Sequence, residues 1–457
     1  MSVVFAAEEL AAWSGGRWLT SPCAAATGFG TDTRALRDGD VFVAVRTGRR
    51  DGHDFLAAAR EQGAAGALVA RVVDDVLPQL LVDDPLAALR RVAAAWRARF
   101  PGRVVGITGS VGKTSTKEFL AHLLGAAAFA TEANLNNTIG VPLMLLRADP
   151  ARHRFAVIEA GMSVPGELGV SAAVVRPDLA VVTAVEPVHL EGVGSLAGVA
   201  REKASLVAAL ASGGRAIVPA GLLAWPDFVA HAARTIAVRF EGEDAPAAAP
   251  ARVVRAAFVP TPAGRALSLD GEIFPLGTLS DGLARNAALA LVAARELGVS
   301  AAELAAVSGR WSPPAGRGSV HADGDRVFYV DCYNSSPASL LDSVGAFDRL
   351  TAGGPAPRLF VLGGMAELGP ASAQLHRDCG ARLPLRPGDR VVAFGGEAAA
   401  FLQGAAHPGA LLSLAASVEE AAAVVAAHRG CVFLKGSRSF ALERCLPPAV
   451  RGALSFH

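Results

Sequence analysis

Short apolar runs that end at glycine or polar turns recur along most of this chain, with helical spacing between them. The runs of β type lie at 103–108, 155–159, 179–185 and 215–219, and again at 327–331, 358–364, 391–396 and 432–436. Strands that alternate with helical stretches are typical of mostly parallel α/β sheets with helices on both faces. The pattern therefore predicts an α/β fold with two doubly wound units, one in the middle and one in the last part of the chain.

Breaks in this pattern predict three domains. The alternation begins after Pro101-Gly102, and a second break falls at Trp311-Ser312-Pro313-Pro314, after a long apolar helix expected over 286–297. The Pro- and Ala-rich segment 241–251 has no periodicity and predicts a surface loop. The expected domains are residues 1–100, 101–312 and 313–457.

Composition narrows the class of protein. The 457 residues suffice for about three domains, and 43 Lys and Arg against 42 Asp and Glu leave no basic field for nucleic acid or an anionic membrane. Charges interrupt every apolar run before about 18 residues, so no membrane span is expected. The five scattered cysteines form no CxxC pair, and the N-terminal segment has no basic leader. We therefore expect an enzyme-sized protein of the reducing cytoplasm, without a disulfide framework or a zinc site.

The sharpest chemical signal is a glycine-rich turn between the expected strand 103–108 and a helix expected over 114–124. Glycines let backbone N–H groups converge on phosphate oxygens, while a lysine reaches the β- and γ-phosphates and a threonine ligates Mg²⁺. The residues expected to bind the nucleotide are Gly109, Ser110, Val111, Gly112, Lys113, Thr114 and Ser115. The loop is a variant, because Ile107 stands where the usual pattern has glycine. Simple chain reversal is the alternative, but the intact Gly-Lys-Thr favours ATP or a related nucleotide.

A second segment, 134–142, reads NLNNTIGVP, and with TGSVGKT at 108–114 it resembles the ATP-dependent Mur ligases of peptidoglycan synthesis. Further similar stretches lie in order along nearly the whole chain: TDTRALRDGDVFVAV and DGHDF near the start, HLEGVGSLAGVAREK in the middle, and PAGRG, DCYNSSPAS, MAELG and KGSRS towards the end. The segments HLEGVGSL and NLNNTIGVP favour the branch of the family that adds a dipeptide.

The resemblance implies both a fold and a reaction. The fold has an N-terminal domain for the UDP end of the substrate, a central ATPase domain and a C-terminal Rossmann-like domain that closes over the site. In the reaction, a substrate carboxylate attacks the γ-phosphate of ATP, and an amine then attacks the resulting acyl phosphate. The implied substrates are UDP-N-acetylmuramoyl-tripeptide and D-alanyl-D-alanine, with ATP and Mg²⁺.

The same resemblance implies a catalytic and metal-binding group. It assigns Thr114, Glu159, His189 and Lys203 to Mg²⁺, with Lys113 at the phosphates, and Lys203 aligns with a lysine that these ligases commonly carbamoylate. Glu159 also fits on chemistry alone, because it ends a parallel strand where such sheets open into a ligand crevice. Taken alone, His189 would be a structural histidine and Lys203 a helix-face lysine, solvated or paired with a neighbouring carboxylate.

The remaining residues implied by the resemblance bind the nucleotide or the substrates. Those assigned to the nucleotide are Asn136, Asn137, Asn286, Arg317 and Asp331. Those assigned to the UDP end are Asp32, Thr33 and Arg34, and those assigned to the amino-acid substrates are Asn334, Lys435, Ser437 and Arg438. A cation in the last group has a clear task, because it pairs with a dipeptide carboxylate. On residue chemistry alone, Asn136 and Asn137 are turn caps and Arg34 is a surface ion pair.

Four residues, at three places in the chain, depart from the family pattern. The His-Asn pair that contributes to adenine binding falls on Gly282-Leu283, an aspartate falls on Gly364, and an asparagine falls on Ser336. These changes leave room for a degenerate Mur-like protein that binds nucleotide without ligating. The retained phosphate and metal positions count against that reading. A sister ligase that adds a single amino acid, or a folylpolyglutamate-type ligase, is the other alternative.

Overall fold

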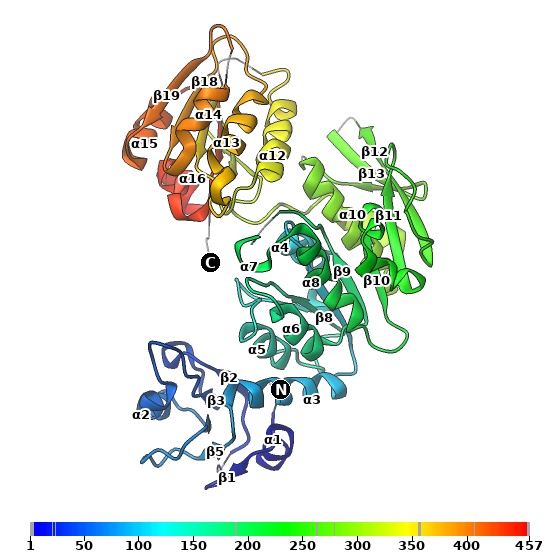
Figure 1. Cartoon of the computed structure of the whole chain (residues 1–457), viewed down its shortest axis with the longest axis vertical. Helices are drawn as coiled ribbons and strands as arrows, with labels where there is room; N and C mark the ends of the chain where they lie inside the picture. The colour runs from blue at the N-terminus through cyan, green and yellow to red at the C-terminus, as the bar shows by residue number, and fades with distance from the viewer. Residues whose placement is uncertain are drawn as a thin grey trace.

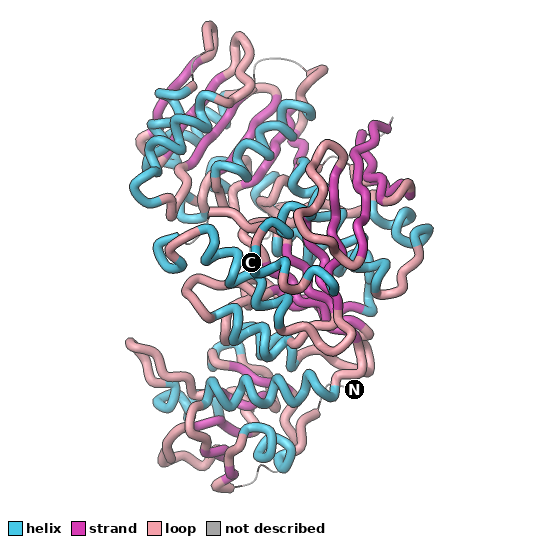
Figure 2. Tube along the Cα trace, turned by 45° about the vertical axis from the view of Figure 1, so that its right-hand side comes forward, coloured by secondary structure: helices cyan, strands magenta, loops and turns pink. Residues whose placement is uncertain are grey.

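The computed structural model describes residues 4–20, 22, 24–187, 190–261, 264–277, 279–354, 358–405 and 407–454. Within these residues the chain forms three sheets in succession, and Figure 1 shows the three parts following one another along the long axis of the molecule. Figure 2 shows strands in each part with helices packed beside them. The predicted three-part α/β fold is confirmed. No helix of the described ranges has the length and apolarity needed to cross a membrane.

The first part contains a sheet with the strand order β1-β5-β4-β3-β2, parallel except between β1 and β5. Its elements are α1 (Ala7–Ser14), β1 (Arg17–Trp18), β2 (Gly28–Gly30), β3 (Asp40–Val43), α2 (Leu56–Glu61), β4 (Gly66–Val69) and β5 (Gln79–Leu81). The helix α3 (Pro85–Arg99) follows, and the Asp84 side chain caps it by accepting from the N–H groups of Leu86 and Ala87. In Figure 1, α3 lies between this sheet and the next part of the chain.

The middle part is built on a sheet with the order β14-β13-β12-β11-β10-β9-β6-β8-β7. Its strands are β6 (Arg103–Thr108), β7 (Ala128–Ala130), β8 (Phe155–Glu159), β9 (Leu179–Val182), β10 (Arg215–Pro219), β11 (Thr235–Phe240), β12 (Arg252–Thr261), β13 (Gly264–Leu269) and β14 (Glu272–Pro275). Its helices are α4 (Lys113–Leu124), α5 (Gly140–Leu146), α6 (Glu167–Val175), α7 (Leu190–Val193), α8 (Leu196–Ala208), α9 (Pro226–Val229), α10 (Asp281–Glu296) and α11 (Ala301–Ser308).

Alternate residues of the central strands face opposite helix layers. Val105 and Ile107 pack with α4 and α10, whereas Val104 and Ile158 pack with α3, α5 and α6. A parallel sheet that is buried on both faces explains the continuous apolar runs in the sequence. It also places the carboxyl ends of β6 and β8 side by side, because Ile107 is paired with Glu159.

The far edge of the middle sheet differs from the sequence-based expectation. Strands β12, β13 and β14 form an antiparallel extension that the apolar runs did not predict. The half-exposed side chains of β12 explain this, since its apolar residues do not form a continuous buried run. The predicted surface loop at 241–251 is confirmed, because it connects β11 to β12 without regular structure.

The last part holds a sheet with the order β15-β16-β20-β17-β18-β19, parallel except between β15 and β16. Its strands are β15 (Ser319–Asp323), β16 (Arg326–Asp331), β17 (Leu359–Gly363), β18 (Arg390–Phe394), β19 (Leu411–Ala415) and β20 (Cys431–Lys435). Its helices are α12 (Pro337–Leu350), α13 (Ser372–Ala381), α14 (Ala399–Gly404), α15 (Val418–Ala427) and α16 (Pro448–Gly452). The predicted second doubly wound unit is confirmed.

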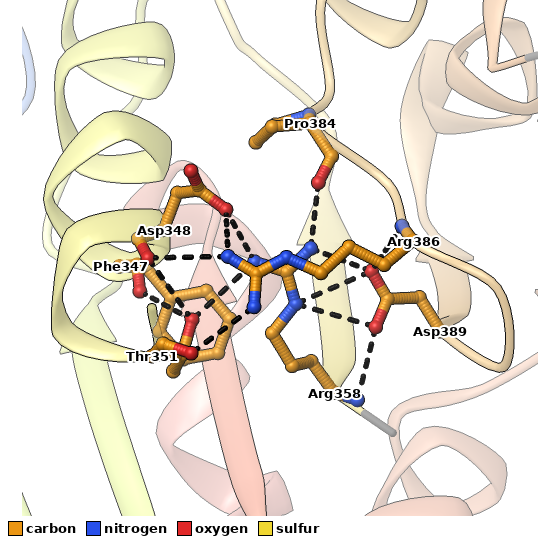
Figure 3. Close-up of polar contacts among 7 residues, drawn as sticks. All are labelled: Phe347, Asp348, Thr351, Arg358, Pro384, Arg386 and Asp389. Carbon is orange, nitrogen blue, oxygen red and sulfur yellow. Dashed lines mark hydrogen bonds and ion pairs between the residues drawn. The ribbon is translucent and has the colours of Figure 1, made fainter. Parts of the chain in front are cut away.

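A buried ion-pair network ties α12 to this last sheet (Figure 3). The Arg358 side chain is 1% exposed and contacts Asp389 at 2.6 Å and Asp348 of α12 at 2.6 Å. Its guanidinium group also donates to the carbonyl oxygen of Pro384 at 2.6 Å, and Arg386 contacts Asp348 at 2.7 Å. The C-terminal end of α12 is therefore fixed to the starts of β17 and β18.

Candidate active site

A cavity of about 470 Å³ opens between the middle and last parts of the chain. One side of the cavity is lined by residues 110–115 of the phosphate loop (residues 109–115), the end of β8 and the start of α10. The other side is lined by residues of β16, α12 and β20. The carboxyl ends of parallel strands in both sheets thus meet at one cavity, which is where α/β sheets bind ligands.

The phosphate loop is held open by glycine geometry and by the segment after β9. Gly109 and Gly112 have φ values of +151° and +82°, and a Cβ at Gly109 would lie 1.9 Å from Thr183 Oγ1. The Thr183 hydroxyl donates to the carbonyl oxygen of Val111 at 2.5 Å, and Ser110 Oγ accepts from the Glu186 N–H at 2.9 Å. This loop therefore needs glycine at both positions.

Lys113, the first residue of α4, bends back over the loop. Its Nζ donates to the carbonyl oxygens of Gly109 at 2.8 Å and Ser110 at 3.3 Å. Burial lowers the pKa of Lys113 below its usual range, although the carboxylate of Glu159 opposes that effect. The ammonium group is therefore held beside the loop whose backbone would receive phosphate oxygens.

Glu159 is a buried carboxylate with one oxygen in use. Its Oε1 accepts from Thr114 Oγ1 at 3.2 Å and from Asn136 Nδ2 at 2.8 Å. Its Oε2 is buried and has no hydrogen-bond partner among the described residues. A buried carboxylate oxygen without a donor is costly, and a divalent cation satisfies such an oxygen. The pair of Thr114 and Glu159 thus fits a hard cation such as Mg²⁺.

The other two residues assigned to the metal are His189 and Lys203, and the structure describes only the second of them. His189 lies outside the described residues. Lys203 of α8 is buried, with 1% exposure, rather than solvated on the helix face. Burial, together with the charge of Lys113, lowers the pKa of Lys203 to about 7. Within the described ranges, no group of three or more His, Cys, Asp or Glu residues is placed to hold a metal ion.

The C-terminal residues assigned to ligands fall into two groups. Arg317, Asp331, Asn334 and Lys435 line the cavity, and Lys435 Nζ contacts Asp331 Oδ2 at 2.7 Å. The Arg317 guanidinium lies 3.9 Å from the ring centroid of Tyr333. Lys435 is therefore paired with Asp331, so two residues predicted for different substrates form one ion pair.

The second group lies away from the cavity lining. Ser437 Oγ accepts from the N–H of Ala366 at 2.9 Å, and Arg438 contacts Glu443 at 2.5 Å. These contacts hold the turn after β20. The structure therefore brings only Asn334 and Lys435 of the predicted amino-acid-substrate residues to the cavity.

The residues assigned to the UDP end, and Asn137, make the local contacts that their residue types alone predict. Asp32 caps a short 3₁₀ turn, Thr33–Ala35, and contacts Arg34 at 2.5 Å on the exposed surface. The Arg34 hydrogen bonds lower the pKa of Asp32 to about 2. Asn137 Oδ1 accepts from the N–H of Gly140 at 2.8 Å, at the start of α5. None of these side chains lines the cavity.

Two contacts between α12 and the start of α10 were not predicted from the sequence. Asp342 of α12 accepts from the Gly282 N–H at 2.9 Å, and Arg349 contacts Asp281 at 2.7 Å. A Cβ at Gly282 would lie 2.6 Å from Asp342 Oδ2. Burial raises the pKa of Asp342 above its usual range. The departure at Gly282 thus makes room for a contact between the middle and last parts, and the unusual glycine was its only signal.

The other two departures also have structural roles. Ser336 caps α12 and lines the cavity. Gly364 is closely packed, since an added Cβ would lie 2.8 Å from the carbonyl oxygen of Gly395. Both positions therefore support local folding where the family pattern has a longer polar side chain.

Replacing Gly112 with Ala is expected to weaken nucleotide binding by at least about tenfold, a cost of about 1.4 kcal/mol. An added Cβ would lie 2.3 Å from Asn286 Nδ2, and φ of +82° is strained for alanine. Gly125→Ala is the matched control, because Gly125 ends the same helix at φ +59° with open space around it. Titration with a fluorescent ADP analogue checks this, and equal affinities for the two variants would contradict it.

Comparison with known proteins identifies the class. The family model of the Mur ligase middle domain matches residues 107–293, and that of the Mur ligase, glutamate ligase domain matches residues 316–438. The chain belongs to the Mur ligase family and is a ligase. The resemblance read from the sequence is therefore confirmed.

Two relatives carry the same enzyme name, and two solved structures carry the name MurF. The UDP-N-acetylmuramoyl-tripeptide–D-alanyl-D-alanine ligase of Escherichia coli K12 is 34% identical over 90% of this chain and 91% of its own length. That of Bacillus subtilis 168 is 29% identical over 94% of both chains. The crystal structure of MurF from Acinetobacter baumannii matches with a TM-score of 0.84 and 28% identity, over 97% of this chain and 98% of its own. MurF ligase from Thermotoga maritima in complex with ADP matches with a TM-score of 0.75 and 27% identity, over 92% and 96%.

Proposed function

We propose that this chain joins D-alanyl-D-alanine to UDP-N-acetylmuramoyl-tripeptide in an ATP-dependent reaction of peptidoglycan precursor synthesis. The observation that carries the proposal is the shared cavity, in which Lys113, Thr114 and Glu159 face Arg317 and Lys435. A carboxylate that attacks a triphosphate brings like charges together, so a site with cations on both sides suits this chemistry. The relatives named for this reaction, matched over nearly their full length, support it.

The proposed division of labour follows the three parts. Residues 1–100 bind the UDP end through Asp32, Thr33 and Arg34, residues 101–312 bind ATP, and residues 313–457 supply the amino-acid-substrate site. The sheets support these boundaries, because the middle sheet spans 103–275 and the last sheet spans 319–435. The ADP complex of the Thermotoga maritima protein supports an adenine nucleotide as the ligand of the middle part.

The residues around the phosphate loop each have a proposed role in holding the phosphates or Mg²⁺. The loop from Gly109 to Ser115 holds the phosphates by its backbone N–H groups, and Lys113 lies against their negative charge. Thr114 and Glu159 hold Mg²⁺ together with His189 and a carbamoylated Lys203. A bound Mg²⁺ supplies positive charge that offsets the charge of the phosphate groups.

The remaining proposed residues, from both sides of the cavity, bind the rest of the nucleotide and the amine substrate. Arg317 and Asp331 approach the phosphates and the ribose. Asn136 and Asn286, which line the cavity, position oxygens of the nucleotide or substrate, and Asn137 is the proposed residue next to them outside the lining. The proposed amine-side residues are Asn334 and Lys435, which line the cavity, with Ser437 and Arg438 at the turn after β20, outside the lining. Since Lys435 is paired with Asp331, an incoming dipeptide carboxylate would share or replace that partner. Close approach of the two walls would exclude water from a hydrolysable acyl phosphate.

The test is phosphate release from Mg-ATP with UDP-N-acetylmuramoyl-tripeptide, with and without D-alanyl-D-alanine, followed by mass analysis of the product. We expect a dipeptide-dependent rate and a pentapeptide product. Turnover with a single amino acid would instead select a sister ligase. Tight nucleotide binding without turnover on any amine would instead indicate a degenerate binding protein. The departure from the family pattern at Gly282-Leu283 is the reason for testing this alternative.

Activity is expected to depend on dissolved CO₂ through Lys203. A pKa of about 7 leaves much of this amine neutral at pH 7.5, and only a neutral amine forms a carbamate. The neutral fraction falls as pH drops below 7, so activity should fall there and in CO₂-depleted buffer. Lys203→Ala should be inactive but partly restored by formate or acetate. Full activity without CO₂, or no rescue by short carboxylates, would contradict carbamoylation.

A further inference from the structure

Lys117 is a buried lysine beside the site that the proposed reaction does not use. It lies on α4, three residues after Thr114, and its side chain is 1% exposed. Its Nζ donates to the carbonyl oxygen of Thr131 at 2.5 Å and contacts Glu118 at 2.7 Å. A buried charge is costly even when it is paired, and an apolar side chain would fill the same space without that cost. Lys117 does not line the cavity and therefore does not contact a ligand there. We therefore infer its role from its hydrogen bond with Thr131.

Thr131 continues the sheet where β7 ends. The pairing of β7 with β8 stops at Ala130 and Val157, and the Thr131 N–H then donates to the carbonyl oxygen of Val157 at 3.0 Å. The next donor on β8 is the N–H of Glu159, which donates to Thr131 Oγ1 at 2.9 Å. The carbonyl oxygen of Thr131 accepts from Lys117 instead. A side-chain hydroxyl therefore forms the last rung of the ladder, at the residue that carries the functional carboxylate.

This arrangement fixes Glu159 on both sides. On the β6 side, Ile107 is paired with Glu159, and the N–H of Ala160 donates to the carbonyl oxygen of Ile107 at 2.8 Å. On the β7 side, Thr131 is the contact. Through Lys117, the strand that carries Glu159 is thus connected to the helix that carries Thr114. This buried chain of contacts adds a second connection between the two groups, beside the direct hydrogen bond from Thr114 Oγ1 to Glu159 Oε1 at 3.2 Å.

We propose that Lys117 and Thr131 are positioning residues that aim the unpartnered Oε2 of Glu159 at the cation held with Thr114. The inference rests on the proposed function, because it takes Thr114 and Glu159 as the cation's ligands. Groups that orient a metal ligand typically change metal affinity by about 10- to 100-fold when they are removed. Loss of the Thr131 hydroxyl should therefore raise the Mg²⁺ requirement while leaving the phosphate loop intact.

The experiment compares Thr131→Val with Thr131→Ser in the full-length protein. Binding of a fluorescent ADP analogue is measured without Mg²⁺ and across a Mg²⁺ titration. For Thr131→Val we expect the half-saturating Mg²⁺ concentration to rise about tenfold or more, with Mg²⁺-free affinity unchanged. Thr131→Ser, which keeps the hydroxyl, should behave as the wild type. Thr235→Val is the matched control, because Thr235 also has a buried, hydrogen-bonded hydroxyl but lies on β11, which β10, β9 and β6 separate from β8. The Thr235 hydroxyl donates to the carbonyl oxygen of His231 at 2.9 Å.

Three outcomes would overturn the inference. The first is an unchanged Mg²⁺ requirement in Thr131→Val, and the second is the same defect in Thr131→Ser. The third is a parallel loss of affinity with and without Mg²⁺, which would show general damage. Lys117→Met, where it folds, should reproduce the Mg²⁺ shift. A wild-type protein that binds the analogue with no response to Mg²⁺ would overturn the cation site itself, and one that binds no analogue would overturn the proposed function.

Discussion

Replacing Lys113 with Met is expected to lower the rate of phosphate release by at least about a thousandfold. The Lys113 ammonium is the cation that the structure places directly over the phosphate loop, through its contacts with the carbonyl oxygens of Gly109 and Ser110. A methionine fills similar space but supplies no charge where the transferring phosphoryl group would gather it. Because burial already disfavours the charged form of Lys113, the pKa of which is lowered, the substitution should not unfold the protein.

The control for this variant separates chemistry from folding. Lys113→Arg keeps a charge but replaces a compact ammonium with a planar fork, so partial activity at most is expected. Thermal unfolding of Lys113→Met should match that of the wild type, and the rate loss should appear in kcat. More than a tenth of the wild-type rate in Lys113→Met would show that another group carries the phosphate charge.

The phosphate end of the site could be predicted because its signals are local. Strand, glycine turn and helix lie within about twenty residues, and the expected strands 103–108 and 155–159 match β6 and β8 residue for residue. Buried parallel strands read as continuous apolar runs, so their carboxyl ends, and Glu159 with them, are visible in sequence. The expected helix at 286–297 began five residues late, because α10 starts at Asp281 with the Ser280 cap and few apolar residues in its first turn.

The rest of the site depends on contacts between distant segments, which no local pattern encodes. Asp342 reaches the start of α10 from sixty residues away, and Lys435 pairs with Asp331 across adjacent strands. The family resemblance assigned Lys435 and Asp331 to different ligands, whereas the register of β16 and β20 places the two residues opposite each other. Thr131 gave no signal at all, since its role comes from replacing a backbone acceptor at the end of β7.

Replacing Asp389 with Asn is expected to destabilise the last part of the chain by about 3–5 kcal/mol. Asp389 is fully buried, and its carboxylate accepts from both Nε and Nη2 of Arg358, which is itself 1% exposed. Asparagine keeps the shape but removes the charge. Among the described residues, the Arg358 guanidinium then keeps the partly exposed Asp348 as its one anionic partner. The same network fixes α12, which carries Asp342 and Arg349 to the start of α10, so the cavity should loosen as well.

Urea unfolding of three variants tests this account of the buried pair. Glu419→Gln is the matched control, because it breaks the exposed pair of Glu419 with Arg444 and should cost at most about 1 kcal/mol. The double variant Arg358→Met, Asp389→Asn should recover part of the stability lost in Asp389→Asn, because no buried charge remains. Asparagine is kept at position 389 because the Asp389 side chain also accepts from the backbone N–H groups of Arg358 and Arg386, which an apolar residue would leave unpaired. A loss in Asp389→Asn as small as that in Glu419→Gln would show that α12 is anchored by apolar packing rather than by this network.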